Sequence, residues 1–317
     1  MNVMDGLVVV DKPAGLTSHD VVSRCRRLFS QKRVGHAGTL DPDATGVLLV
    51  GLGQVTRLLQ FLAGMPKRYS GEVVLGVATS TLDASGVVTR TWDLSGAGLE
   101  AARAAASSLI GDILQVPPMV SALKVGGIRL HRLARAGVEV DRAPRAVRVG
   151  RLDISMAADQ SVEHEGAGPV LAIDVECSSG TYVRSLAADL GTAMGGGAYL
   201  RRLRRLAVGP FSVGEAVTLE QLADPSVWPL AVLPPAAALR GMATAEVGPS
   251  VAATVSHGAV LPLGLLAEGG GRGPGPWAVV DREGQLLAVY QLHGPERAKP
   301  AVVLAPLLPG QPPGEPC

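Results

Sequence analysis

The chain has 317 residues, of which 47% are hydrophobic and 18% are charged. This composition is typical of a folded soluble protein and excludes disorder as the general state. The length allows one large domain or two of ordinary size. The net charge is only +1, which taken alone disfavours a nucleic-acid partner.

The sequence carries no signal for export or membrane insertion. It opens MNVMDGLVVVDKP, with acidic residues and only a four-residue apolar run before Asp11, unlike a signal peptide. No uninterrupted apolar run approaches the length of a membrane span. The three cysteines share no C-x-x-C spacing, so neither a disulfide framework nor a zinc site is predicted, and a cytoplasmic protein is expected.

In the first third of the chain, strands and helices follow one another. Residues 7–10 read LVVV, which predicts a buried strand, and Thr17 or Ser18 caps a helix whose apolar residues recur at helical spacing. VLLV at 47–50 predicts a second strand. Alternating residues at 69–77 predict a third, although Val74 blurs the pattern.

Further along, residues 171–177 alternate more cleanly between apolar and polar side chains and predict another strand. Gly180 and Thr181 then open a helix that runs through Leu190. Mixed strands and helices without regular βαβ periodicity indicate an α+β domain.

The last part of the chain changes character. Residues 224–235 are rich in proline, and after about residue 240 short strands are predicted at VAATV (251–255) and in WAVVDREGQLLAVY (277–290), which turns at 281–284. These features indicate a small separate β module. Loops are expected in two segments, 157–168 and 264–276, and a disordered tail is expected at the C-terminus, LLPGQPPGEPC.

The charge is unevenly placed along the chain. Residues 124–151 contain eight Lys and Arg against two acidic residues, a local balance of +6, and residues 184–205 contain five Arg against one Asp, a local balance of +4. A localised basic surface of this kind fits a phosphate backbone. The alternative is a set of solvated arginine-rich helix faces.

One loop is the candidate chemical centre. Residues 35–46 read GHAGTLDPDATG, in which Gly38, Pro42 and Gly46 permit close turns that can present the Asp41 carboxylate rigidly in a cleft. An aspartate before proline is also an ordinary turn former, so the local chemistry alone leaves a structural role for Asp41 open.

The sequence resembles the TruB family of tRNA pseudouridine synthases in five ordered blocks. The first is GLVVVDKPAGLTSHDVV followed by RVGHAGTLDPDATGVLLV, which covers residues 6–22 and 33–50. The others, KRYSGEVVLGVATSTLDASG, PPMVSALKVGGIRLHRLARAG, CSSGTYVRSLAADLG and AYLRRLRRLAVGPF, begin at residues 67, 117, 177 and 198. Together the blocks cover most of the first 211 residues, which makes a chance match very improbable.

The resemblance implies an α+β fold of the pseudouridine synthase type, in which helices flank a central mixed, mainly antiparallel sheet. It implies a catalytic domain over residues 1–238, with an RNA-contacting thumb at about 118–150. It further implies a PUA-like RNA-binding module at 239–317, which includes the flexible tail.

The resemblance also assigns roles to the matching residues. It makes Asp41 the nucleophile or base and Arg184 its partner. It makes Tyr69 the residue that packs against the flipped base and can assist proton transfer from C5. It places Tyr182 and Leu203 in the uracil pocket and His36 in the space vacated by flipped nucleotides. It gives Lys12 and Lys124 supporting contacts near phosphate or sheet backbone.

Without the family, several of these residues have plainer interpretations. A buried arginine is more often part of a structural ion pair, Tyr69 and Leu203 are core residues by default, and His36 is a surface hydrogen bonder. The route taken by Asp41 also stays open, because a carboxylate can attack the sugar, add to the uracil ring or take a proton from the ribose.

The predicted function is isomerisation of uridine 55 in the T loop of tRNA to pseudouridine, by a monomer that needs no cofactor and no metal. The partner is the T stem-loop, recognised by shape and single-stranded bases. Two alternatives remain. One is a catalytically idle RNA-binding protein or tRNA chaperone of the same fold, and the other is a metal-dependent RNA hydrolase using His36, Asp41 and Asp43.

Overall fold

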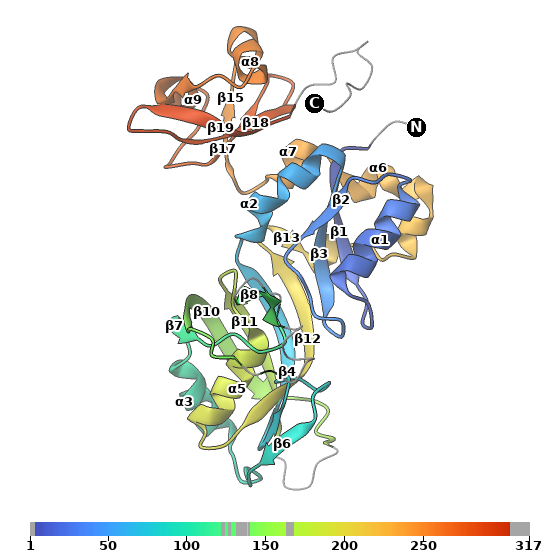
Figure 1. Ribbon diagram of the computed structural model, residues 1–317, viewed down its shortest axis with the longest axis vertical. Helices are drawn as coiled ribbons and strands as arrows, with labels where there is room; N and C mark the ends of the chain where they lie inside the picture. Colours follow the sequence, from blue (N-terminus) through green and yellow to red (C-terminus); the bar gives the residue numbers. More distant parts are fainter. Residues whose placement is uncertain are drawn as a thin grey trace.

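The computed structural model describes residues 4–121, 124–125, 128–130, 138, 140–162 and 168–304, with only the backbone at 124, 125, 128 and 129. The molecule is elongated (Figure 1) and contains a long central sheet and a separate smaller sheet near the C-terminus. Within the described residues, no helix is long and apolar enough to span a membrane.

A ten-stranded sheet forms the centre of the fold, in the order β14-β1-β3-β12-β4-β11-β10-β7, with β2 beside β3 and β13 beside β12. The predicted strands at 7–10, 47–50 and 171–177 are present in it, and the one predicted at 69–77 is present only as far as Leu75, because Gly76 (φ +80°) breaks the strand and Val77 starts a strand of another sheet. The strands are β1 (Gly6–Lys12), β2 (Val34–Ala37), β3 (Thr45–Leu52), β4 (Lys67–Leu75), β7 (Gly111–Gln115), β10 (Arg145–Met156), β11 (Val170–Cys177), β12 (Ala198–Val208), β13 (Phe211–Ser212) and β14 (Val232–Leu233).

The two halves of this sheet meet at β12. Strand β12 pairs antiparallel with β4 over most of its length but pairs parallel with β3 only at Arg204–Thr45 and Arg205–Gly46. Gly46 has φ +98°, and a Cβ at this position would lie 2.1 Å from the Arg205 carbonyl oxygen. Only glycine therefore allows the start of β3 to approach β12 this closely.

Helices cover the sheet where its side chains are apolar. Helix α1 (Ser18–Leu28) begins at the predicted cap Thr17, which forms a capping box with Asp20, and it buries one face against β1 and β3. Helices α3 (Leu99–Ser107) and α5 (Val183–Ala193) lie over β10 and β11 (Figure 1). The hydrophobic cluster beneath them includes Val73, Ile173 and Leu186.

Shorter elements complete the first 240 residues. Most of them connect the strands of the sheet. Those between residues 53 and 129 are η1 (Gly53–Arg57), α2 (Leu59–Ala63), β5 (Val77–Thr79), β6 (Val88–Thr91), β8 (Lys124–Val125) and β9 (Ile128–Arg129). Those after β13 are η2 (Val213–Glu215), η3 (Gln221–Ala223), η4 (Pro225–Val227), α6 (Trp228–Ala231) and α7 (Pro235–Ala238).

The C-terminal module has its own five-stranded sheet, in the order β15-β17-β18-β19-β16, and its own core around Trp277 and Tyr290. Its residues Val280, Val289 and Val302 belong to the same hydrophobic cluster as Leu58 and Phe211 of the first 240 residues. The elements are β15 (Ala243–Glu246), α8 (Pro249–Ser256), β16 (Leu261–Pro262), α9 (Leu263–Glu268), β17 (Trp277–Val280), β18 (Leu286–Leu292) and β19 (Arg297–Val303).

Two predictions for this module are wrong. VAATV is not a strand but the body of α8, which starts with Pro249 at its first turn after an extended Gly248; proline fixes the backbone angle that a helix start requires. Part of the expected loop at 264–276 is helix α9. The predicted tail and residues 163–167 lie outside the described residues.

Candidate active site

The loop that carries Asp41 is fixed from below by buried hydrogen bonds. The Ser18 hydroxyl donates to the Leu40 carbonyl (3.2 Å) and accepts from the Leu40 amide (2.9 Å), which ties the start of α1 to the residue before Asp41. The Lys12 ammonium donates to the Pro42 carbonyl at 2.8 Å. Asp41 is therefore held on both sides by residues from β1 and α1.

Asp41 and Arg184 form a bidentate ion pair, although 143 positions separate them in the sequence. Arg184 Nε lies 2.9 Å from Asp41 Oδ2, and Nη2 lies 3.1 Å from Oδ1. The side chain of Arg184 is 5% exposed, whereas that of Asp41 is 44% exposed. The guanidinium is thus a fixed, buried group that presents the carboxylate towards solvent.

The surroundings of Arg184 explain its rigidity. Nη1 donates to the Thr81 carbonyl at 3.1 Å, and Nη2 donates to the Val120 carbonyl at 2.8 Å. Its burial therefore leaves few hydrogen-bonding groups unsatisfied. Burial raises the pKa of Asp41 above the ordinary aspartate value, while the Arg184 charge acts in the opposite direction.

A second carboxylate, Asp83, was not among the residues predicted from the sequence. Its Oδ2 lies 3.4 Å from Arg184 Nη1, so one guanidinium faces two carboxylates. The other oxygen of Asp83 accepts hydrogen bonds from the hydroxyls of Thr81 and Ser85. The alternating pattern Thr81-x-Asp83-x-Ser85 is the signal that could have identified a fixed aspartate there.

Asp41, Asp83 and Arg184 line one end of a cleft of about 880 Å³. Leu200, Leu203, Gly71 and Ile173 supply an apolar wall from the sheet. Leu203 both lines the cleft and packs against the hydrophobic cluster beneath it. Charged side chains, among them Glu72 and Arg204, also line the cleft, and a cleft of this volume suits a ligand of nucleotide size.

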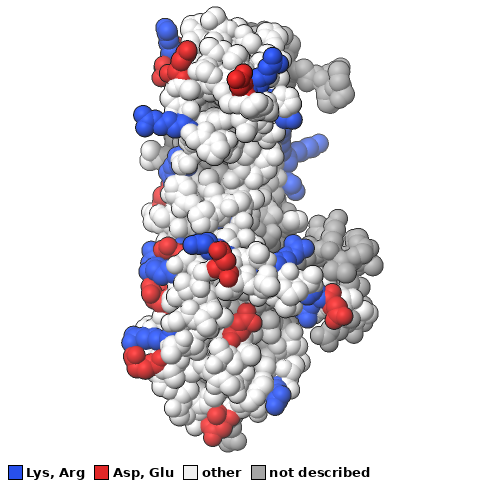
Figure 2. Space-filling view, turned by 90° about the vertical axis from the view of Figure 1, so that its left-hand side faces the viewer, with Lys and Arg blue, Asp and Glu red and all other residues white. Residues whose placement is uncertain are grey.

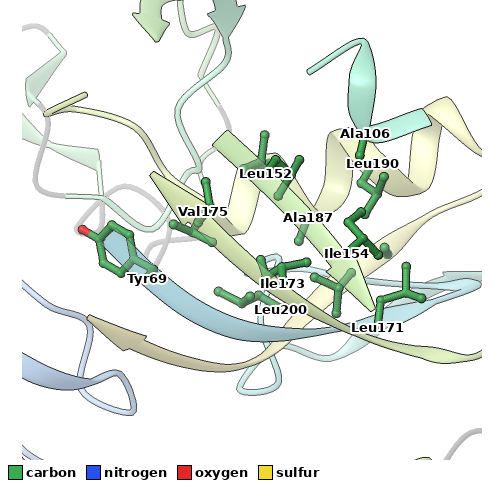
Figure 3. Close-up of a cluster of buried hydrophobic side chains, with 14 of the residues drawn as sticks. Tyr69, Ala106, Leu152, Ile154, Leu171, Ile173, Val175, Ala187, Leu190 and Leu200 are labelled. Atoms are coloured by element: carbon green, nitrogen blue, oxygen red, sulfur yellow. The ribbon is translucent and has the colours of Figure 1, made fainter. Parts of the chain in front are cut away.

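Tyr69 lies on β4 at the margin of the hydrophobic cluster and is 8% exposed. Figure 3 shows its ring beside the apolar side chains, with the hydroxyl directed away from them. Burial raises its pKa, and the nearby charge of Arg205 opposes this shift. Tyr69 is thus both a core residue and the carrier of a polar group at the edge of that core.

The remaining predicted residues lie around this centre in different ways. His36 on β2 lies edge-on to His19, with ring centroids 5.4 Å apart, and burial lowers its pKa to about 4, so its imidazole is neutral at pH 7. Tyr182 caps α5, and its backbone is fixed by two hydrogen bonds to the Gln115 side chain (2.8 and 3.1 Å). The side chain of Lys124 lies outside the described residues.

Lys12 is fully buried, and its ammonium donates to the carbonyls of Pro13, Leu16 and Pro42 at 2.6 to 2.9 Å. Burial lowers its pKa to about 8. All three donors are directed at protein backbone, so we place Lys12 among the groups that support the Asp41 loop.

The predicted basic surface is wrong for residues 184–205. Arg205 is buried, and the other four arginines of this segment face carboxylates from distant parts of the chain. These pairs are Arg184 with Asp41, Arg201 with Glu72, Arg202 with Glu72 and Asp159, and Arg204 with Asp11. Local charge counting missed these partners because β12 lies inside the sheet. On the face in Figure 2, basic and acidic side chains lie next to one another.

The comparisons with known proteins agree with this geometry. A family model described as "TruB family pseudouridylate synthase (N terminal domain)" matches residues 26–183, and one described as "tRNA pseudouridylate synthase B C-terminal domain" matches residues 184–230. A Rhodococcus jostii protein named tRNA pseudouridine synthase B is 45% identical over 303 residues, 95% of this chain and 94% of the relative. An Arthrobacter protein of the same name is 44% identical over 96% and 97% of the two chains.

Among solved structures, a chain of "Crystal Structure of a Cbf5-Nop10-Gar1 Complex" superposes with a TM-score of 0.68 at 27% identity, over 90% of this chain and 78% of that chain. The central sheet, with a buried arginine pairing a cleft-side aspartate, thus defines a pseudouridine synthase. The chain belongs to the TruB family of these enzymes.

Proposed function

We propose that this protein isomerises uridine 55 in the T loop of tRNA to pseudouridine. The observation that carries the proposal is the Asp41–Arg184 ion pair at the end of a nucleotide-sized cleft, in a chain that belongs to the TruB family. Relatives at 45% and 44% identity that carry the name tRNA pseudouridine synthase B support tRNA as the substrate.

The chemistry needs few groups. Breaking the N-glycosidic bond and forming a C-glycosidic bond within one site requires no electron transfer and no energy source, so a single ionised carboxylate can initiate it. Arg184 favours the ionised form of Asp41 against the effect of burial. Attack on the sugar, addition to the ring and removal of a ribose proton all remain open to this carboxylate.

The base must leave its stack before C5 can face C1′, so the nucleotide has to be flipped into the cleft. We assign Leu203 and Tyr182 to the uracil pocket, His36 to the space left by flipped nucleotides, and Tyr69 to the face of the base. The new bond forms at C5, so the C5 proton must be removed, and the Tyr69 hydroxyl is a group that can assist this step.

RNA contacts outside the cleft are assigned by the same proposal. The segment at 118–150, much of which lies outside the described residues, is the thumb that closes on the T stem-loop, and residues 239–317 form a PUA-like module that contacts RNA. We further propose that the enzyme is a monomer, because one chain supplies every residue assigned to the site. We also propose that it acts in the cytoplasm.

An Asp41→Asn variant tests the proposal. The purified protein is incubated with an unmodified tRNA transcript, without added metal or nucleotide, and pseudouridine is mapped by chemical probing. We expect wild type to convert the T-loop uridine and Asp41→Asn to be inactive, with tRNA binding within roughly tenfold of wild type because affinity rests on phosphate and shape contacts. Asp153→Asn, which alters an exposed carboxylate on β10, is the matched control.

Three outcomes contradict the proposal. Tight binding without conversion by wild type supports the idle RNA-binding alternative. Chelator-sensitive cleavage of the RNA supports the hydrolase alternative. Substantial turnover by Asp41→Asn shows that the site is assigned to the wrong residue.

A further inference from the structure

Arg205 is a buried arginine that the reaction described so far does not use. Its residue is 1% exposed and lies on β12 where the two halves of the central sheet meet. Its Cα is paired with Gly46 of β3 on one side and with Tyr69 of β4 on the other. It therefore lies between the Asp41 loop and the tyrosine assigned to the base.

The guanidinium of Arg205 bonds to backbone rather than to a carboxylate. Nε donates to the Val47 carbonyl at 2.7 Å, and Nη2 donates to the Gly38 carbonyl at 2.8 Å. Among the described residues Arg205 takes part in no ion pair, in contrast to its neighbour Arg204, which lies 2.7 Å from an Asp11 carboxylate oxygen. A buried cation without a counter-ion is costly, so any negative charge that develops beside it is stabilised.

Tyr69 is the group placed to develop that charge. It is the Cα partner of Arg205 across β4 and β12, the Arg205 charge acts on its hydroxyl, and that hydroxyl points away from the apolar cluster (Figure 3). The other groups whose charge acts on this hydroxyl are Cys177 from β11 and Asp41, and both of them raise its pKa. Arg205 is the group that lowers it.

We propose that Arg205 is a positioning residue that orients the Tyr69 hydroxyl and stabilises negative charge on its oxygen while the C5 proton of the flipped base is removed. This inference rests on the role assigned to Tyr69 under the proposed function. Tyr69 gives its hydroxyl proton to water and its oxygen then takes the C5 proton. The C5–H bond breaks, an O–H bond forms, and the C5–H electron pair becomes the C5–C6 double bond while the C6–N1 π pair moves to N1, which takes a proton from water.

Arg205 also braces the Asp41 loop through the Gly38 carbonyl, so a purely structural role must be separated from an effect on Tyr69. A double-mutant cycle makes this separation, because a bracing role does not depend on the tyrosine hydroxyl. The variants are Arg205→Gln, Tyr69→Phe and the double variant. Arg68→Gln is the control, since Arg68 neighbours Tyr69 on β4 but forms an exposed ion pair with Asp174.

The readout is the single-turnover rate constant on tRNA as a function of pH. We expect Arg205→Gln to lower the rate about tenfold to hundredfold, as for a weakened acid–base group, with tRNA affinity within about threefold. The part of the rate profile in which the rate rises towards alkaline pH should move to higher pH in this variant. In the Tyr69→Phe background the same change should have little further effect, and Arg68→Gln should match wild type.

Equal losses from Arg205→Gln with and without the Tyr69 hydroxyl would overturn the inference while leaving the proposed function intact. Failure of wild type to convert tRNA would instead overturn the proposed function itself. If Arg205→Gln does not fold, the question is decided on wild type by NMR of ring-labelled tyrosine, which follows the ionisation of each tyrosine with pH. The Tyr69→Phe variant assigns the Tyr69 signal.

The reference for that measurement is Tyr290, a buried tyrosine whose hydroxyl donates to the Ala259 carbonyl at 2.7 Å and whose pKa is raised by burial alone. The inference requires Tyr69 to ionise at lower pH than Tyr290. Ionisation of Tyr69 at the same or higher pH would overturn it.

Discussion

Asp41 is a half-exposed carboxylate whose pKa is set mainly by its burial and by two charged neighbours, Arg184 and Asp83, of opposite effect. Burial and the Asp83 charge raise its pKa, and Arg184 lowers it. The protonated form cannot act as nucleophile or base, so activity should disappear as pH falls through the raised pKa. The acid limb of the rate profile is therefore expected above the ordinary aspartate value of 3.8.

Removing the like charge should move that limb in a defined direction. Asp83→Asn removes the neighbouring negative charge and leaves the cations Arg184 and Lys12 to act on Asp41, so the acid limb should shift to lower pH, even if the maximal rate also falls. Single-turnover rates across the acid range measure the shift, and Asp153→Asn should leave the limb in place. A limb that moves to higher pH in Asp83→Asn would show that Asp83 does not raise the Asp41 pKa.

At this scale the sequence predicted the residues that carry recognisable motifs. The ion pair of Asp41 with Arg184, 143 positions away, was expected from the family blocks and not from spacing. Asp83 and Arg205 were missed because their importance depends on what tertiary structure places around them. An arginine in the run RRLRR gives no local sign of whether it faces solvent, a carboxylate or a tyrosine.

At the scale of elements, the parallel contact between β3 and β12 connects the Asp41 loop to the rest of the active site, and Gly46 permits this contact. Gly46→Ala adds a Cβ only 2.1 Å from the Arg205 carbonyl oxygen at φ +98°. We expect it to destabilise the fold by about 3 kcal/mol or more and to lower activity, because both steric overlap and backbone strain act. Urea unfolding and single-turnover rates measure the two effects.

Gly195→Ala is the control for backbone strain alone, since Gly195 has φ +82° but nothing within 4 Å of an added Cβ. Its cost should be roughly 1 kcal/mol with activity retained. Equal destabilisation by the two substitutions would mean that the contact with β12 relaxes easily.

Strands and helices with clear periodicity were predicted correctly, and short ones were not. The capped helix at Thr17 and the strand at 171–177 are long enough for their pattern to identify them. VAATV is apolar, short and β-branched, so its composition suggests a strand. Its helical state follows from Pro249 at the helix start and from packing on the module core around Val255.

Over the whole molecule, the fold class was predictable but the RNA-binding charge was not. Counting charges along the chain assigned a basic surface to residues 184–205, whose exposed arginines are in fact neutralised by Glu72, Asp159 and Asp11. Pairing across a sheet depends on strand order, and a count along the sequence contains no information on that order. Unpaired cations elsewhere must therefore provide part of the affinity for phosphate.

One such group lies at the end of α1 and in the loop that follows it. Arg24, Arg26, Arg27, Lys32 and Arg33 are all exposed, and none takes part in an ion pair within the described part of the chain. Helix α1 starts beside Leu40 and has 11 residues. At about 1.5 Å per residue, the cations on α1 lie roughly 9 to 15 Å along the helix from its start beside Leu40, within reach of RNA whose loop occupies the cleft.

Replacing Arg24, Arg27 and Lys32 together by Gln should therefore weaken tRNA binding about tenfold at moderate salt and reduce the salt dependence of the affinity by up to about three phosphate contacts. The rate constant at saturating enzyme should stay near wild type, because the substitutions are remote from Asp41. The matched control replaces three cations that are already paired with carboxylates, Arg68, Arg103 and Arg151. Both triples remove three positive charges, so equal losses would show that net charge matters rather than a surface on α1. A loss confined to the first triple would place tRNA phosphates along this helix.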